Sequence, residues 1–203
     1  MAKSLHQGSK SVVPYLHIFV EEPSAKIVLD VILPKILPEN VYFQVHSHQG
    51  KQDLEHAIKT TVPSISRIPG ARILIVRDQD NDDCKKVKQR IKTIIRGRSF
   101  APTLVRIVCR ELEAWFLGDL KAVSEAYPRF KPGQHAGKVD FRNVDLIQNT
   151  HEYLLAIIPE YKDRENLPKL EVAESIAPLL DLENNTSESF NQFISGVEKL
   201  IAA

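Results

Sequence analysis

The sequence has few cysteines and no long apolar run. Its two cysteines, Cys84 and Cys109, lack the spacing of a zinc site, so we expect free thiols in a reducing compartment. No uninterrupted apolar stretch is long enough to cross a membrane, and the opening MAKSLHQGSKS lacks the apolar core of a signal peptide. These absences predict a cytoplasmic protein with no membrane partner.

The sequence also lacks an excess of charge of either sign. Its 27 Lys and Arg residues nearly balance 26 Asp and Glu residues, so composition alone does not indicate a nucleic-acid-binding protein. Any such function must therefore come from a local cluster of charge. The 203 residues, 43% of them hydrophobic, are enough for one large domain or for one domain with an appendage.

Four short apolar runs separated by helical stretches predict the fold. Strands are expected at 15–20, 41–45, 71–76 and 104–109, and the helices that connect them begin at Pro23, near Asp53 and at Cys84. Connections of this length favour crossovers, so we predict an α/β fold whose mostly parallel four-stranded sheet carries helices on both faces. We place this domain at 13–118, after a flexible tail at 1–12, and predict a helical C-terminal extension packed on it at 119–203.

Acidic residues follow three of the four predicted strands. They are Glu21 and Glu22 after the first strand, Asp78, Asp80, Asp82 and Asp83 after the third, and Glu111 and Glu113 after the fourth. Ligands of open parallel sheets bind beyond the carboxyl ends of the strands, and crowded carboxylates need a cation or basic groups to compensate their repulsion. The pattern therefore favours Mg²⁺, with Mn²⁺ as a substitute. A solvated acidic loop that caps the next helix is the alternative.

Individual roles follow from these positions. If the first and third strands are neighbours, Glu21, Asp78 and Asp80 can converge on one ion, and Asp82 or Glu111 would serve a second ion. The alternatives are that Asp82 caps the helix at 84–96 and that Glu111 forms ion pairs with nearby arginines.

Other polar residues are candidates for phosphate binding and proton transfer. Beyond the second strand, His48 is a candidate acid or base, with a plain polar loop residue as the alternative. Candidates for contact with a phosphate backbone are Lys51, Lys85 and Lys88; the alternative for the helix lysines is a solvated face.

A glutamate after the first strand and an Asp-x-Asp after the third resemble the Toprim fold. This is the nucleotidyl-transfer and hydrolysis domain of primases, type IA and II topoisomerases and overcoming-lysogenisation-defect nucleases. The resemblance places Glu21 on the family's Val-Glu-Gly position and Asp78 and Asp80 on its Asp-x-Asp, and it implies that these three residues bind magnesium. One departure is Glu22, which stands where the family usually has glycine.

More closely, five segments together resemble an uncharacterised bacterial family of Toprim-like proteins, often encoded beside ATPases. The segments are VEEPSA, HQGKQDL, DQDNDDC, RELEAWFLGD and SESF. The resemblance implies a magnesium-dependent phosphodiester hydrolase, a nuclease acting on DNA or RNA in defence against foreign nucleic acid, with an ATPase partner. The alternative is a non-catalytic subunit of an ATPase complex that binds a nucleotide or a partner. Whether the chain forms a homodimer is left open.

Two other families that transfer phosphoryl groups fit less well. Haloacid-dehalogenase-like phosphatases carry their Asp-x-Asp after the first strand, whereas here it follows the third. Response-regulator receivers have a Ser or Thr at the end of the fourth strand, whereas here that strand ends at Cys109, Arg110 and Glu111.

Overall fold

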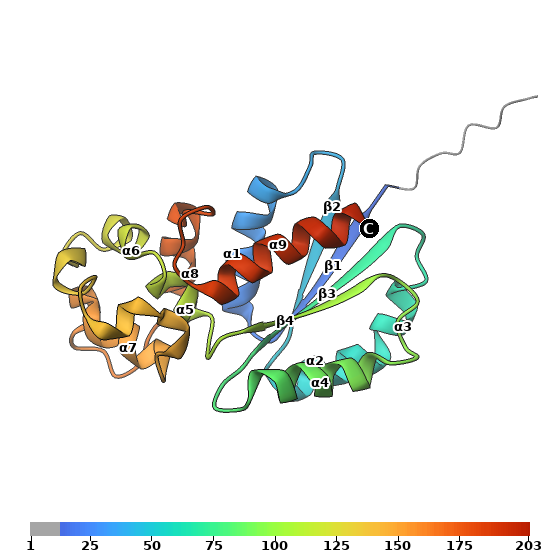
Figure 1. Ribbon diagram of the computed structural model, residues 1–203, viewed down its shortest axis with the longest axis horizontal. Helices are drawn as coiled ribbons and strands as arrows, with labels where there is room; N and C mark the ends of the chain where they lie inside the picture. The colour runs from blue at the N-terminus through green and yellow to red at the C-terminus, as the bar shows by residue number, and fades with distance from the viewer. Residues whose placement is uncertain (1–12) are drawn as a thin grey trace, which may run out of the picture.

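A parallel sheet forms the centre of the molecule in a computed structural model that describes residues 13–203 (Figure 1). The strands are β1 (Tyr15–Val20), β2 (Tyr42–Ser47), β3 (Ala71–Asp78) and β4 (Thr103–Val108). They lie in the order β2-β1-β3-β4, and all three pairings are parallel. The predicted α/β fold is confirmed. The tail predicted at 1–12 lies outside the described residues.

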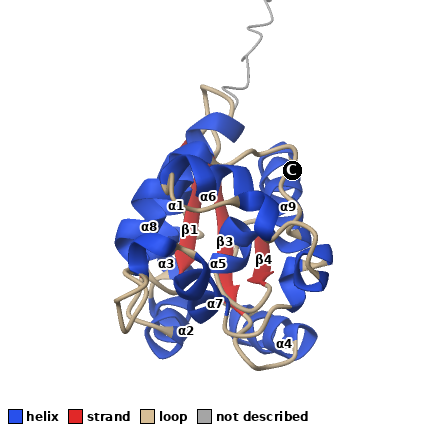
Figure 2. Cartoon of the chain, turned by 90° about the vertical axis from the view of Figure 1, so that its left-hand side faces the viewer, coloured by secondary structure: helices blue, strands red, loops and turns tan. Residues whose placement is uncertain are grey.

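Helices cover both faces of the sheet. Those that connect the strands are α1 (Pro23–Ile36), α2 (Lys51–Thr60), α3 (Val62–Ile65) and α4 (Cys84–Ile95). Side chains alternate between the two faces of a strand, so Ile18 joins the core beneath α1 while Phe19 joins a second core with residues of α2 and α4. Figure 1 shows α1 and α9 on one side of the sheet and α2, α3 and α4 on the other. In Figure 2 the strands run between these two layers of helices.

Residues after β4 are largely helical and include the C-terminal extension predicted at 119–203. The α-helices of this region are α5 (Glu113–Leu117), α6 (Leu120–Ala126), α7 (Thr150–Ile157), α8 (Lys169–Ile176) and α9 (Glu188–Ala202). Short 3-10 helices lie between them: η1 (Pro132–Gln134), η2 (Val139–Arg142), η3 (Val144–Leu146), η4 (Pro159–Tyr161) and η5 (Ala177–Leu179). Because one buried apolar cluster includes both Leu16 of β1 and Leu154 of α7, the extension shares its core with the sheet.

Two helix starts follow the side chains that the sequence offers there. The Asp83 carboxylate accepts a hydrogen bond from the backbone N–H of Lys86 at the start of α4, and the Ser187 hydroxyl accepts one from the N–H of Phe190 at the start of α9. The apolar stripe of α9 is buried against the sheet. None of the helices within residues 13–203 combines the length and the apolar character needed to cross a bilayer.

The register brings the strand ends together at one edge of the sheet. Val20, the last residue of β1, is paired with Ser47 of β2 and with Val76 of β3. The acids that follow β1 and β3 are therefore neighbours, as the prediction of a shared site requires. In Figure 1 helices α5 to α8 gather beyond this edge, so residues of the extension can reach the same acids.

Candidate active site

An arginine lies among the acids at the ends of β1 and β3. Arg77 is only 3% exposed, and its Nη1 donates to Glu21 Oε2 at 2.5 Å, to the Asp78 carbonyl at 2.5 Å and to Asp80 Oδ2 at 3.3 Å. Its guanidinium therefore lies between the two carboxylates and compensates their charge. On the other side of Asp80, the exposed Lys51 Nζ lies 3.9 Å from the same Oδ2.

The position of Asp80 is fixed by a hydrogen bond between the loops that follow β3 and β4. Asp80 and Arg110 both adopt left-handed backbone conformations, with φ of 53° and 60°, and the Asp80 N–H donates to the Arg110 carbonyl at 2.8 Å. Such conformations cost about 1–3 kcal/mol each in residues other than glycine and persist where the surrounding structure enforces them. The loops after β3 and β4 thus hold each other in place.

A second group of acids lies next to the first and is compensated by a lysine from the extension. Lys169 of α8 places its Nζ 3.0 Å from Glu22 Oε2 and 3.9 Å from Glu113 Oε1. Glu113 is 1% exposed, and its Oε2 has no hydrogen-bond partner. Burial raises the pKa of Glu113 while Lys169 opposes the rise. An unpartnered buried carboxylate oxygen of this kind can accept a cation.

Asp78 connects the two groups of acids. Burial raises the pKa of its carboxyl well above the usual range, and the neighbouring Glu113, Glu21 and Glu22 raise it further. Burial likewise raises the pKa of Glu21, against the opposing charge of Arg77. Burial and mutual repulsion thus disfavour the charged forms of these two carboxyls even with both basic side chains in place.

These side chains are of the kind that binds a hard divalent cation, because they offer carboxylate oxygens. One of these oxygens, Glu113 Oε2, has no hydrogen-bond partner. Within residues 13–203, however, no group of three or more His, Cys, Asp or Glu side chains is arranged to hold an ion as it stands. The guanidinium of Arg77 fills the space between Glu21 and Asp80. The magnesium role of Glu21, Asp78 and Asp80 therefore stays a prediction, and binding would require Arg77 to give way.

A cleft of about 460 Å³ opens beside these acids. It is lined by Glu21, Lys51, Asp80, Asn81, Asp82, Arg110, Glu111, Asn149 and His151. The fold therefore brings together five residues that the sequence analysis singled out, from four different loops and helices. The lining combines four carboxylates with the basic side chains of Lys51 and Arg110 and the imidazole of His151.

Glu111 is held by the first turn of α7. Its carboxylate accepts hydrogen bonds from Thr150 Oγ1 at 3.0 Å, from the His151 backbone N–H at 3.1 Å and from His151 Nδ1 at 2.7 Å. Burial alone would raise the pKa of Glu111, but these hydrogen bonds lower it. The alternative paired Glu111 with Arg106 or Arg110, but these arginines donate to the carbonyls of Gln192 and Asp80. Glu111 thus orients His151 towards the cleft.

Other candidates lie away from this cleft. His48 is buried, and its Nδ1 donates to the Val20 carbonyl at 2.8 Å, so it ties the end of β2 to β1. Lys85 is exposed on α4, and Lys88 lines a separate groove between α4 and β4. The roles of these three residues stay predictions.

Three residues of the site were missed in the sequence analysis. Arg77 directly follows an apolar run, and the strand was predicted to end before it, at Val76. Lys169 and His151 come from a region whose weak periodicity gave no reason to connect them with acids forty or more residues earlier. The arginine beside the Asp-x-Asp is visible in the sequence, but its burial is not.

Comparison with known proteins supports the fold. The chain is similar in structure to the C-terminal region of the Burkholderia pseudomallei OLD protein, with a TM-score of 0.57 and 14% sequence identity. The likeness covers 92% of this chain and 98% of that chain. No match was found among curated proteins. The model of the family described as "Domain of unknown function (DUF4276)" matches residues 20–198, and the chain belongs to this family.

Proposed function

We propose that the protein is a Toprim-like, magnesium-dependent phosphodiester hydrolase, a nuclease acting on DNA or RNA. The observation that carries the proposal is the pair of acid groups at adjacent strand ends, joined through Asp78, beside an open cleft. The resemblance of Glu21, Asp78 and Asp80 to the Toprim motif supports the same assignment. The fold is similar to that of the C-terminal region of the OLD protein, which carries the name of the overcoming-lysogenisation-defect nucleases. This similarity agrees with the proposed nuclease function.

Two groups of residues would hold magnesium. Glu21, Asp78 and Asp80 form one set, and Glu22, Asp78 and Glu113 form another. When bound, the ion would polarise a phosphoryl oxygen and lower the pKa of a bound water. Lys51 and Arg110 would attract the phosphate into the cleft by their charge.

His151 would move the proton. Glu111 fixes its Nδ1 through hydrogen bonds of 2.7 Å and 2.8 Å, which leaves Nε2 as the nitrogen available to water or to a leaving oxygen. A carboxylate that holds one ring nitrogen also sets the tautomer and the orientation of the ring. Glu111 is therefore a positioning residue for His151 in this proposal rather than a metal ligand.

Cleavage assays with Mg²⁺ or Mn²⁺ test the proposal. Wild type should cut at least one of single-stranded DNA, duplex DNA or RNA, and Asp78→Asn should abolish the cut while the fold is retained. Asp163→Asn is a matched control, since Asp163 is exposed and lies away from the cleft. If wild type and Asp78→Asn cleave equally across all substrates, the proposed hydrolase is wrong.

A non-catalytic subunit that binds a nucleotide or an ATPase partner is the second candidate. One observation favours it: Arg77 and Lys169 already lie among the acids, so the site can exist without an ion. Calorimetry with ATP and magnesium would support this reading if the nucleotide binds and is never hydrolysed. A role in defence beside an ATPase belongs to the same proposal and would be tested by co-purification of the two gene products.

A further inference from the structure

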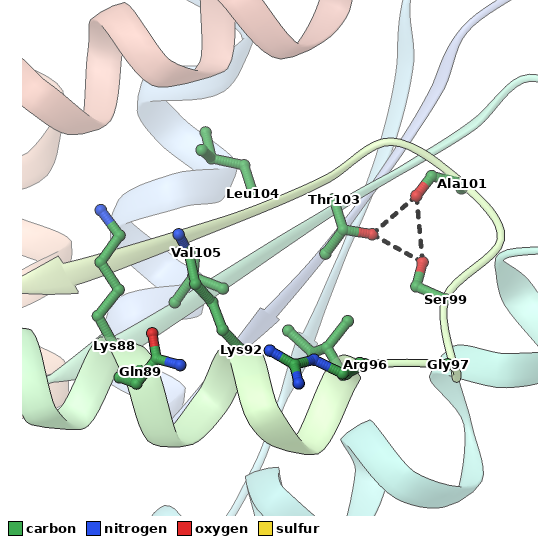
Figure 3. A pocket seen from close by; sticks show the side chains of 11 residues that line it. Lys88, Gln89, Lys92, Arg96, Gly97, Ser99, Ala101, Thr103, Leu104 and Val105 are labelled. Atoms are coloured by element: carbon green, nitrogen blue, oxygen red, sulfur yellow. Dashed lines mark hydrogen bonds between the residues drawn. The ribbon is translucent and has the colours of Figure 1, made fainter.

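A second groove lies between α4 and β4, away from the acid cleft (Figure 3). Its volume is about 630 Å³. One wall is formed by Lys88, Gln89, Lys92, Ile95 and Arg96 of α4 and its end, the other by Thr103, Leu104 and Val105 of β4, and the loop residues Gly97, Ser99 and Ala101 close one end. Three of these side chains are basic and none is acidic, so the groove suits an anion.

The basic side chains form a regular row. Lys88 and Lys92 are four residues apart in α4, which places them on one face of the helix about 6 Å apart along its axis, and Arg96 follows four residues later as the C-cap. This interval is comparable with the separation of successive phosphates in an extended nucleic acid strand. Figure 3 shows Lys88 and Lys92 reaching from α4 towards β4. Burial lowers the pKa of Lys88, and the nearby Arg106 and Lys92 lower it further, so positive charge is crowded here.

The opposite wall is the free edge of the sheet. β4 pairs only with β3, so its outer side has no strand partner within residues 13–203. On the far face of β4 a shallower hollow is lined by Arg106 of β4 and Lys199 of α9, again without an acid. Positive charge therefore flanks the edge strand on both faces.

The groove is connected with the acid cleft through α4. The helix begins directly after Asp82 and Asp83, and Asp82 lines the cleft. Its 12 residues extend roughly 18 Å, so the row from Lys88 to Arg96 leads away from the cleft along one helix. A ligand held in the groove could continue past Lys85 into the cleft.

We propose that this groove binds the sugar-phosphate backbone of single-stranded nucleic acid, and that it holds the part of the strand that extends from the acid cleft. That the bound strand leads to the acid cleft rests on the proposed function, whereas the binding of the strand in the groove does not. A single row of three cations matches one backbone. Electrostatic contacts of this kind bind without sequence preference and weaken with salt.

Binding in the absence of metal tests the inference. The probe is a fluorescent single-stranded oligothymidylate in EDTA, followed by anisotropy over a range of salt concentrations. The variant is Lys92→Glu with Arg96→Glu, which changes two exposed side chains that line the groove. We expect at least a tenfold loss of affinity and a salt slope reduced by about 1.4, since each phosphate contact contributes about 0.7 for single strands.

Lys86→Glu is the control for charge reversal elsewhere on α4: it reverses one charge, where the double variant reverses two, at an exposed position outside the groove. It should change the affinity less than threefold. Equal losses of affinity in Lys86→Glu and in the double variant would overturn the proposed binding in the groove. The same conclusion would follow if the double variant bound the oligonucleotide as tightly as wild type. Lys92→Gln with Arg96→Gln, which removes charge without adding acid, should give a smaller loss of the same sign.

Two further outcomes separate this inference from the proposed hydrolysis and from another partner. If the wild type binds the strand through the groove but never cleaves it with Mg²⁺, the hydrolase fails and the groove stands. If the wild type cleaves the strand, and the double variant cleaves and binds it as well as the wild type does, the proposed binding in the groove is wrong and the proposed hydrolase stands. A polyglutamate peptide that binds as tightly as the oligonucleotide, and is lost in the same variant, would overturn the assignment to nucleic acid.

Discussion

Replacing Arg77 by methionine removes the buried cation from the acid edge. Arg77 is 3% exposed and contacts Glu21, which is 11% exposed at its side chain, at 2.5 Å. Removing one partner of a buried ion pair costs about 3–5 kcal/mol because the other charge is left uncompensated. For a chain of this size, each kcal/mol lowers the melting temperature by about 2–4 °C. In EDTA, Arg77→Met should therefore melt roughly 6–20 °C below wild type.

Magnesium should then act differently on the two proteins. If the guanidinium fills the space that an ion would use, the variant binds Mg²⁺ without having to move Arg77. An ion at a hundredfold excess over its dissociation constant stabilises the folded state by about 2.7 kcal/mol. Titrating Mg²⁺ during thermal unfolding should thus raise the melting temperature of Arg77→Met more than that of wild type.

Arg90→Met provides the control, because Arg90 pairs with Glu55 at 2.9 Å while its side chain is 69% exposed. A surface pair of this kind contributes about 0–1 kcal/mol, so this variant should melt near wild type with or without Mg²⁺. Equal melting of Arg77→Met and wild type in EDTA would refute the idea that Arg77 neutralises the acids. A larger response to Mg²⁺ in wild type would refute the competition between Arg77 and the ion.

Three other predictions concern separate parts of the molecule. His151→Gln should lower kcat of the proposed hydrolysis about 10²–10⁴-fold with little change in KM, and an unchanged pH–rate profile would contradict proton transfer by His151. Burial, aided by the charges of neighbouring histidines, lowers the pKa of His46 to about 4. The contribution of the neutral imidazole to the free energy of unfolding is therefore fully present above the unfolded pKa of about 6.5 and is lost as pH falls towards 4. In urea unfolding between pH 7 and 5, His46→Gln should make this decrease in the free energy of unfolding smaller. Gly118→Ala should cost about 1–3 kcal/mol, because a Cβ there would lie 2.8 Å from the Ser187 backbone nitrogen, whereas Gly133→Ala, with no atom within 4 Å, should unfold like wild type in the same denaturant titration.

Much of the fold could be predicted because the strands are short apolar runs that lie between well-marked helices. Ile73 to Val76 is apolar throughout, as a strand buried on both faces must be, and Asp83 and Ser187 mark helix starts by a local interaction that sequence shows directly. The order of the strands did not follow from these patterns. Their neighbours are set by packing between distant segments, and only the assumption that β1 and β3 are adjacent gave the acids a common place.

The site was predictable only where its residues carry a motif. Glu21, Asp78 and Asp80 are at the strand ends as expected. Asp82 and Glu111 line the cleft together with Glu21 and Asp80. Arg77 and Lys169, which decide the charge balance, are ordinary residues in the sequence. Their importance comes from burial beside carboxylates, which depends on the whole fold. His48 is buried and bonds to the backbone of β1, a contact that its loop position in the sequence did not indicate.

The acid edge depends on a counter-charge from the far end of the chain. Lys169 lies 147 residues after Glu22, so a ribosome must release most of the protein before this carboxylate and Glu113 receive their cation. Until α8 docks, Glu22 and Glu113 lack this cation, and the energetic balance favours leaving them in contact with water. Docking of the extension would therefore be a late event of folding, and a nascent chain that ends before α8 would expose its carboxylates to solvent or to metal ions.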